Sequence, residues 1–128
     1  MPSQIFRIGL LGVTLLAPYA VWTPNADESY SGVPLAMLQA MVNAPIGKEL
    51  HKEGFTSYLI ASGSDGYPVV LSLAEVDPSF RGGQVLVADA SNGQPLAKSG
   101  PFQLIVSEDK RPARWVRHLS SIPLQGAH

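Results

Sequence analysis

Residues 55–61 (FTSYLIA), the turn residues 63–66 (GSDG) and residues 67–71 (YPVVL) decide the fold expected for this chain. Both outer runs are rich in the β-branched and aromatic residues that suit half-buried strands. The pair Asp65-Gly66 between them is the best hairpin signal in the sequence, because tight turns need residues that tolerate a positive φ. The stretch therefore predicts two antiparallel strands.

Outward from this hairpin, short strands and short helices are interspersed. Strands are expected over residues 19–23, 84–88, 102–106 and 119–124, with a polar loop or hairpin end over residues 25–31. Pro34 and the apolar residues that follow at helical spacing predict a helix over residues 34–43, ended by Pro45. Another helical turn is expected over residues 46–52, closed by Gly54. Ser72 and Glu75 have the spacing of a capping box at the start of a one-turn helix.

These elements favour the α+β class with a mixed, mostly antiparallel sheet, because no regular helix separates each pair of strands. A length of 128 residues fits one domain. The net charge of −1 provides no positive field for nucleic acid, and nucleic acid is not an expected partner. The chain has no cysteine, which excludes disulfides, thiolate metal sites and cysteine nucleophiles.

Residues 1–20 form an apolar N-terminal segment ahead of a domain expected over residues 21–128. Arg7 followed by the apolar run 8–16 resembles a short signal peptide, which would direct the protein to the periplasm or outside the cell. The alternative is a first buried strand, which fits a cytoplasmic protein, since periodicity does not distinguish the two. The run is too short to predict a stable membrane span.

Motifs for common catalytic chemistry are missing from the sequence. Residues 63–66 resemble a nucleophile elbow only superficially, and there is no phosphate-binding glycine loop. His51, His118 and His128 do not have the spacing of a metal site on one helix face. The acidic pair Glu75 and Asp77 is expected to cap a helix end and to face solvent.

The strongest candidate site is the basic segment, residues 108–118 (EDKRPARWVRH), which holds four of the nine Lys and Arg residues beside a tryptophan. The cluster of Lys110, Arg111, Arg114 and Arg117 is a candidate anion or partner site, because cationic donors, and guanidinium groups above all, match phosphate and carboxylate oxygens. Trp115 is a candidate to stack on or cover a ligand. The alternative is a solvated basic loop with Trp115 held in the core.

Several stretches together resemble the molybdopterin-binding domain of sulfite-oxidase-like oxidoreductases. They are residues 30–35 (YSGVPL) with Leu38, residues 64–67 (SDGY) with 70–75 (VLSLAE), and residues 100–106 (GPFQLIV) with 110–116 (KRPARWV). These stretches lie in the order of the family and cover about residues 30–124. The resemblance implies that family's fold, shortened at its N-terminus. It also implies that Lys110, Arg111, Arg114 and Trp115 lie at the phosphate of a molybdopterin cofactor.

Family enzymes bind molybdenum through a cysteine, whereas the corresponding residues here are Thr23-Pro24-Asn25-Ala26. The resemblance, together with the missing cysteine, implies a stand-alone domain of bacterial type that is not catalytic. Such a domain would bind an anionic small molecule or a protein partner through the basic segment. The alternative is a molybdopterin-dependent oxidoreductase whose metal site contains no cysteine. The sequence leaves the oligomeric state open.

Overall fold

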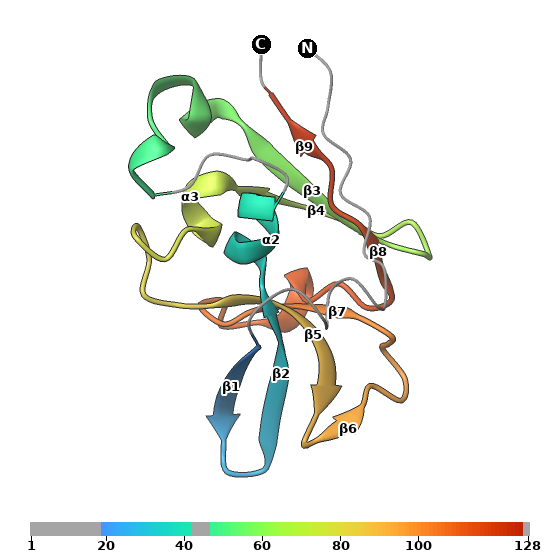
Figure 1. Ribbon diagram of the computed structural model, residues 1–128. Coiled ribbons are helices and arrows are strands. Elements are labelled where there is room, and N and C mark those ends of the chain that lie inside the picture. The colour runs from blue at the N-terminus through green and yellow to red at the C-terminus, as the bar shows by residue number, and fades with distance from the viewer. Residues whose placement is uncertain (1–18, 42–46, 127–128) are drawn as a thin grey trace.

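The computed structural model describes residues 19–41 and 47–126 (Figure 1). Its strands are β1 (Ala20–Asn25), β2 (Glu28–Pro34), β3 (Tyr58–Gly63), β4 (Pro68–Ser72), β5 (Val85–Ser91), β6 (Gln94–Pro95), β7 (Gln103–Val106), β8 (Leu119–Ser121) and β9 (Leu124–Gln125). Its helices are α2 (Leu35–Met41) and α3 (Leu73–Val76), with 3-10 turns η1 (Gly47–Glu49), η2 (Lys52–Thr56) and η3 (Pro112–Arg114). Every strand pairing in this part of the chain is antiparallel, which confirms the predicted α+β class.

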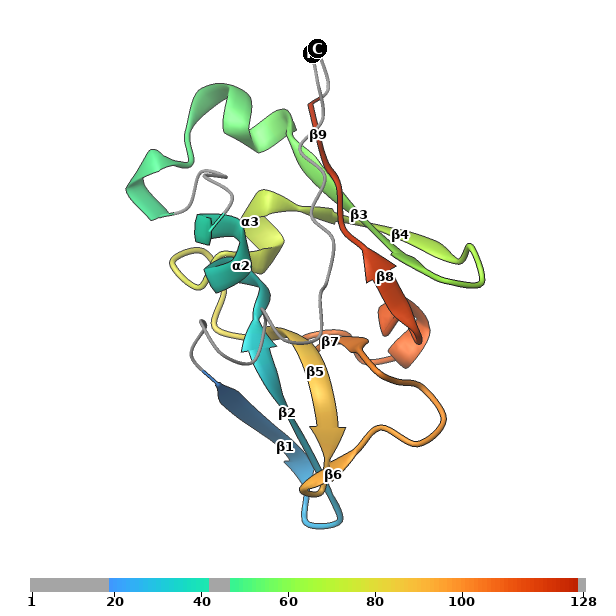
Figure 2. The same ribbon diagram turned by 45° about the vertical axis from the view of Figure 1, so that its right-hand side comes forward.

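The strands form two sheets. In the first sheet β3 is central, with β4 on one edge and β8 and β9 sharing the other edge. In the second sheet the order is β1-β2-β5, and both β6 and β7 pair with the edge of β5 opposite β2. Figures 1 and 2 show the first sheet above the second, with α2 and α3 beside them at the level where the sheets meet.

One hydrophobic core joins the two sheets. Alternate residues of β3 and β4, such as Leu59 and Leu71, point into it from the first sheet. Val87 and Leu104 enter it from the second sheet, and all four side chains are at most 1% exposed. The neighbouring residues Leu86, Ala88 and Ile105 face the other way and form a smaller cluster on the outer face of the second sheet. Strands β5 and β7 are therefore buried on both faces, which explains their continuous apolar runs.

The predicted hairpin is confirmed as β3 and β4, which pair from Tyr58 with Ser72 to Ser62 with Pro68. The turn contains Gly66 at a φ of +85°, a conformation that glycine adopts without steric cost. The capping box is confirmed as well. Ser72 Oγ accepts from the Glu75 amide at 3.1 Å, and Glu75 Oε1 accepts from the Ser72 amide at 2.8 Å.

The hairpin end expected within residues 25–31 is confirmed in a shorter form, because a turn joins β1 to β2 there, whereas a loop over the whole stretch is wrong. Only residues 26–27 form a turn, and β2 begins at Glu28. Ser31 and Gly32 pair with β5 through a bulge, at which a Cβ on Gly32 would lie 2.1 Å from the Val87 carbonyl oxygen. Polar residues are accepted in this strand because its N-terminal half projects away from the main core.

The helical segments also differ from the prediction in their bounds. Helix α2 begins after Pro34, which is the last residue of β2, and residues 42–46, including Pro45, lie outside the described residues. Gly54 does not close a helical turn, because it lies inside η2, and that turn delays the start of β3 to Tyr58. The strand expected over residues 119–124 is divided into β8 and β9.

Residues 1–18 lie outside the described residues, so the signal-peptide and first-strand interpretations of the N-terminal segment stay predictions. The strand expected over residues 19–23 is confirmed as β1, which starts at Ala20. Among the described residues, no helix has the length and apolar character needed to cross a membrane.

Candidate functional site

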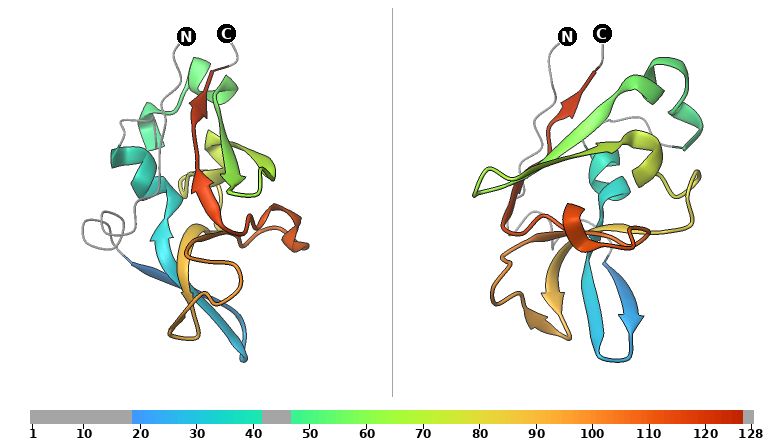
Figure 3. Two further views of the ribbon diagram at one scale, coloured as in Figure 1. Left: turned by 90° about the vertical axis from the view of Figure 1, so that its right-hand side faces the viewer. Right: turned by 180° about the vertical axis from the view of Figure 1, so that it is seen from behind.

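The basic segment runs from the end of β7 to the start of β8 and contains η3. Figure 3 shows this orange-red turn at the level where the two sheets meet. Its contacts reach both sheets. Tyr67, just before β4, donates its hydroxyl hydrogen to the Ala113 carbonyl at 2.8 Å, and Trp115 Nε1 donates to the Val106 carbonyl of β7 at 3.1 Å.

Arg114 is the most heavily bonded residue of the basic segment. Its Nε and one terminal nitrogen donate to the two Asp109 oxygens at 2.9 and 2.8 Å, a bidentate pair. The other terminal nitrogen lies 3.0 Å from Glu75 Oε2 and donates to the Val70 carbonyl at 3.2 Å. These contacts use all but one of the guanidinium donors. Arg114 thereby connects β4 and α3 to the segment after β7.

The charges in this network stabilise one another. Hydrogen bonding to Arg114 is the main reason that the pKa of Asp109 lies below its usual value. Partial burial opposes ionisation of Glu75, but the Ser72 amide and Arg114 outweigh it, and the pKa of Glu75 is lowered. The pKa of Arg114 is raised in turn, chiefly by its hydrogen bonds to Asp109. Two carboxylates beside Arg114 repel a phosphate, so this geometry fits a structural role better than a cofactor-phosphate contact.

Trp115 lies between the two hydrophobic clusters, with its ring edge-on to two aromatic rings of the β1–β2 hairpin. The ring centroids of Trp22 and Tyr30 lie 5.6 and 5.9 Å from that of Trp115. Trp22 and Tyr30 are direct partners across the hairpin and stack on each other at 6.2 Å. Together these rings cover the outer face of β5 and β7. The Trp115 indole is thus held in the fold, as the alternative interpretation of the basic segment expected.

Lys110 and Arg111 are exposed, and neither makes an ion pair or a hydrogen bond within the described residues. The structure therefore separates the four predicted site residues into two groups. Arg114 and Trp115 join elements of the fold, whereas Lys110 and Arg111 present charge to solvent.

A hollow of about 460 Å³ lies next to the end of the basic segment. It brings together Arg117 and Lys98, two cations far apart in the sequence. The other lining residues are Tyr30, Ser91, Gln94, Pro95, Leu96, Ala97, Ser99 and Gln103. No carboxylate lines this hollow within the described residues, and neither Lys98 nor Arg117 forms an ion pair there. The arrangement offers two exposed cations, neither in an ion pair within the described residues, and several polar groups to one open hollow.

Backbone contacts hold the two cation-bearing segments together. The His118 amide donates to the Ser99 carbonyl at 2.7 Å, and the Leu119 amide donates to the Phe102 carbonyl at 2.9 Å. The His118 ring nitrogen Nδ1 lies 2.7 Å from the Gly100 carbonyl, so it must carry a hydrogen, since a carbonyl only accepts. The hollow is therefore fixed by the fold rather than by the long side chains that line it.

Buried polar contacts fix the floor of the hollow. Gln103 is 8% exposed, accepts from Ser99 Oγ at 2.9 Å and donates to the Trp115 carbonyl at 3.4 Å. At Gly63 a Cβ would lie 2.5 Å from the Arg117 carbonyl oxygen, so glycine permits the close approach of the two backbones. Arg117 is consequently positioned by β3 on one side and by the loop after β6 on the other.

A smaller hollow of about 290 Å³ lies on another side of Arg117, lined by Asp65, Tyr67, Pro112, Ala113 and Trp115. The Asp65 carboxylate makes this space less favourable to an anion. Among the described residues, no group of three or more His, Asp and Glu side chains has the geometry of a metal site. The acidic pair Glu75 and Asp77 is structural, because Asp77 accepts hydrogen bonds from Gly47 and Ser79 while Glu75 caps α3.

Sequence reasoning counted Arg117 in the basic cluster but not among the residues expected at the cofactor phosphate, and it missed Lys98. Lys98 follows the turn-forming residues Asn92-Gly93 and Pro95, so no local pattern marks it as a site residue. Only the pairing of the loop with residues 118–119 brings it beside Arg117.

No family model, curated protein or solved structure matches the chain.

Proposed function

We propose that this chain is a non-catalytic domain that binds a small anion in the hollow lined by Lys98 and Arg117. The observation that carries the proposal is the presence of these two cations, neither in an ion pair within the described residues, in one polar hollow. Arg114 is already committed to Asp109 and Glu75. The anion site of the basic segment is thus at its C-terminal end.

The chemistry of the hollow favours phosphate or a carboxylate. A guanidinium offers paired donors to the oxygens of such an anion, and Lys98 adds a mobile point charge. Neutral donors such as the Ser91 hydroxyl and the Gln94 amide line the same space. The volume exceeds that of a simple ion, which leaves room for a ligand with an organic portion.

Kinship with the molybdopterin-binding domain of sulfite-oxidase-like oxidoreductases remains part of the proposal. It rests on the ordered sequence stretches, and the α+β architecture agrees with it only at the level of class. A phosphorylated pterin is accordingly one ligand to test. Its phosphate is proposed to lie beside Arg117 rather than Arg114, because Arg114 is already bonded to Asp109 and Glu75, and no redox step is proposed.

An NMR titration tests this function. Inorganic phosphate, and separately a phosphorylated pterin, is added to the ¹⁵N-labelled protein at low ionic strength. Saturable shifts of the Arg117 Nε–H and the Gln103 side-chain amide are expected, with little change at the Arg114 Nε–H. Shifts centred on Arg114, or none that saturate, contradict the proposal.

A second candidate function is recognition of an acidic protein surface. It is favoured by Lys110 and Arg111, which are exposed and without partners within the described residues. The enzyme alternative, a molybdopterin-dependent oxidoreductase, is distinguished by elemental analysis. Protein produced in a host that makes the cofactor would then contain molybdenum close to one atom per chain.

A further inference from the structure

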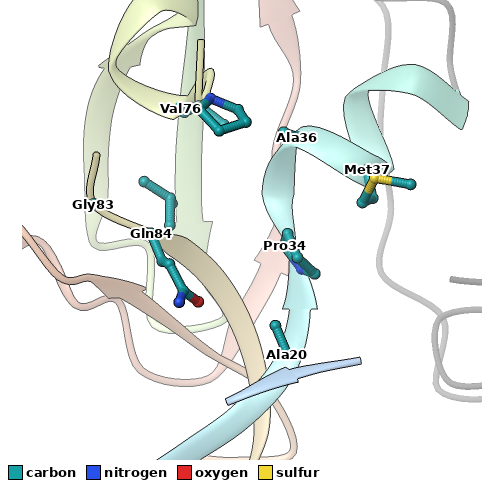
Figure 4. A pocket seen from close by; sticks show the side chains of 9 residues that line it. Ala20, Pro34, Ala36, Met37, Val76, Gly83 and Gln84 are labelled. Atoms are coloured by element: carbon teal, nitrogen blue, oxygen red, sulfur yellow. The ribbon is translucent and has the colours of Figure 1, made fainter. Parts of the chain in front are cut away.

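A pocket of about 310 Å³ lies between the helices and the second sheet, separate from the residues that line the anion hollow. Its walls come from five places: the start of β1, the end of β2, α2, the end of α3 and the segment entering β5. The lining residues are Ala20, Pro34, Ala36, Met37, Val76, Pro78, Gly83, Gln84 and Val85. Figure 4 shows Met37 and Ala36 on one side of the pocket and Gly83 and Gln84 on the other.

The pocket is almost entirely aliphatic. Gln84 is the only lining residue within the described part of the chain whose side chain is polar. Its amide oxygen Oε1 is buried and has no hydrogen-bond partner among the described residues. In Figure 4 this oxygen is turned toward the side on which Pro34 and Ala20 lie. A buried acceptor without a donor costs about 1–3 kcal/mol, so its presence at an apolar pocket needs a reason.

Two hydrogen bonds to Ser107, one to its hydroxyl and one from its amide, fix the main chain of Gln84. Its amide donates to Ser107 Oγ at 2.6 Å, and its carbonyl accepts from the Ser107 amide at 2.9 Å. These contacts continue the β5–β7 ladder by one residue. The main chain of Gln84 is therefore held at the edge of the sheet, with its side chain directed along the pocket.

We propose that this pocket binds a small aliphatic molecule that carries one hydroxyl or amide donor, which donates to Gln84 Oε1. The aliphatic walls match an alkyl body, and the single buried acceptor matches a single donor. The volume of about 310 Å³ is about twice that of the roughly 150 Å³ cavity that holds benzene, so an alkyl chain of about eight carbons fits. No charged group lines the pocket among the described residues, which disfavours a fatty carboxylate.

The test compares 1-octanol with methyl octyl ether, which has a similar body but no donor. Both are titrated into the full chain while the methyl resonances of Met37, Val76 and Val85 are followed by NMR. Octanol is expected to shift these methyls saturably and to bind about tenfold more tightly than the ether. Replacing the acceptor in Gln84→Met should remove that tenfold preference, and Gln94→Met, in the anion hollow, should preserve it.

Three results would overturn the proposal. In the first, octanol produces no saturable methyl shifts. In the second, octanol and the ether bind the wild-type chain equally. In the third, the same methyls shift on dilution without any probe, which means that a second copy of the chain covers the pocket. If Gln84→Met does not fold, Gln84→Leu serves as the second variant, and the comparison of octanol with ether in the wild type still decides.

Discussion

Removing the Arg114 side chain should destabilise the protein substantially, whereas removing that of Arg111 should not. The substitution Arg114→Met keeps an unbranched apolar stem but loses two hydrogen bonds to Asp109, one ion pair to Glu75 and one hydrogen bond to Val70. Arg111→Met is the matched control, since Arg111 is exposed and makes no hydrogen bond or ion pair within the described residues.

The expected loss follows from the number of contacts and their exposure. Hydrogen bonds to charged groups contribute about 1.5–3 kcal/mol each when well buried. The Arg114, Asp109 and Glu75 side chains are 28%, 20% and 30% exposed, so solvent reduces each contribution to about 1 kcal/mol or less. The network then contributes about 3 kcal/mol to the free energy of unfolding. For a domain of this size that corresponds to a melting temperature lower by about 10 °C. Arg111→Met should stay within about 0.5 kcal/mol of wild type.

The effect should also depend on pH. The pKa values of Asp109 and Glu75 are lowered in the folded state, so their ionised forms stabilise the fold above the unfolded pKa. This stabilisation is lost as the pH falls through the folded values. Urea unfolding at pH 7 and at pH 3 should therefore show a large difference between wild type and Arg114→Met at pH 7 and a smaller one at pH 3. Equal stability of the two arginine variants at pH 7, or a difference that does not shrink in acid, would refute the reasoning.

Three further substitutions test other features of the fold. Gln39 is 0% exposed, and neither amide atom has a partner among the described residues. Gln39→Met should therefore raise the free energy of unfolding by about 1–3 kcal/mol, and a loss measured by urea unfolding would contradict this. Gly32→Ala places a Cβ 2.1 Å from the Val87 carbonyl oxygen and should lower the free energy of unfolding by about 1–3 kcal/mol. Gly82→Ala is the control, because the space around Gly82 is open, and it should change that free energy by less than about 0.5 kcal/mol. Ser72→Ala removes the cap of α3 and should lower the melting temperature by about 3–4 °C, equivalent to about 1 kcal/mol; an unchanged value would count against the cap.

The sequence predicted the features of this fold that depend on neighbouring residues. The Asp65-Gly66 turn and the Ser72–Glu75 capping box are local, because each is completed within a few residues. Strand β2 was missed because its polar first half resembles a loop, and only pairing with β1 and β5 makes it extended.

The candidate site shows the same limit. Arg111 and Arg114 look equivalent in the sequence, but Glu75 and Val70, which are far away along the chain, bind Arg114. Arg111 has no ion pair within the described residues. Lys98 has no signal of its own, because only the tertiary contact between Ser99 and His118 places it beside Arg117. Charge clustering thus indicated the segment that contributes Arg117 to the hollow, but it did not indicate which two cations line that hollow.

The most direct test of an anion site at Lys98 and Arg117 is a calorimetric titration of two double variants with inorganic pyrophosphate at low ionic strength. Each double variant removes two positive charges, Lys98→Gln with Arg117→Gln from the hollow and Lys110→Gln with Arg111→Gln from the exposed part of the basic segment. The first pair should weaken binding about tenfold to hundredfold, as expected for losing charge-assisted hydrogen bonds of about 1.5–3 kcal/mol, and the second should weaken it about twofold or less. Equal losses in the two pairs, or a larger loss in the second, would contradict an anion site at Lys98 and Arg117.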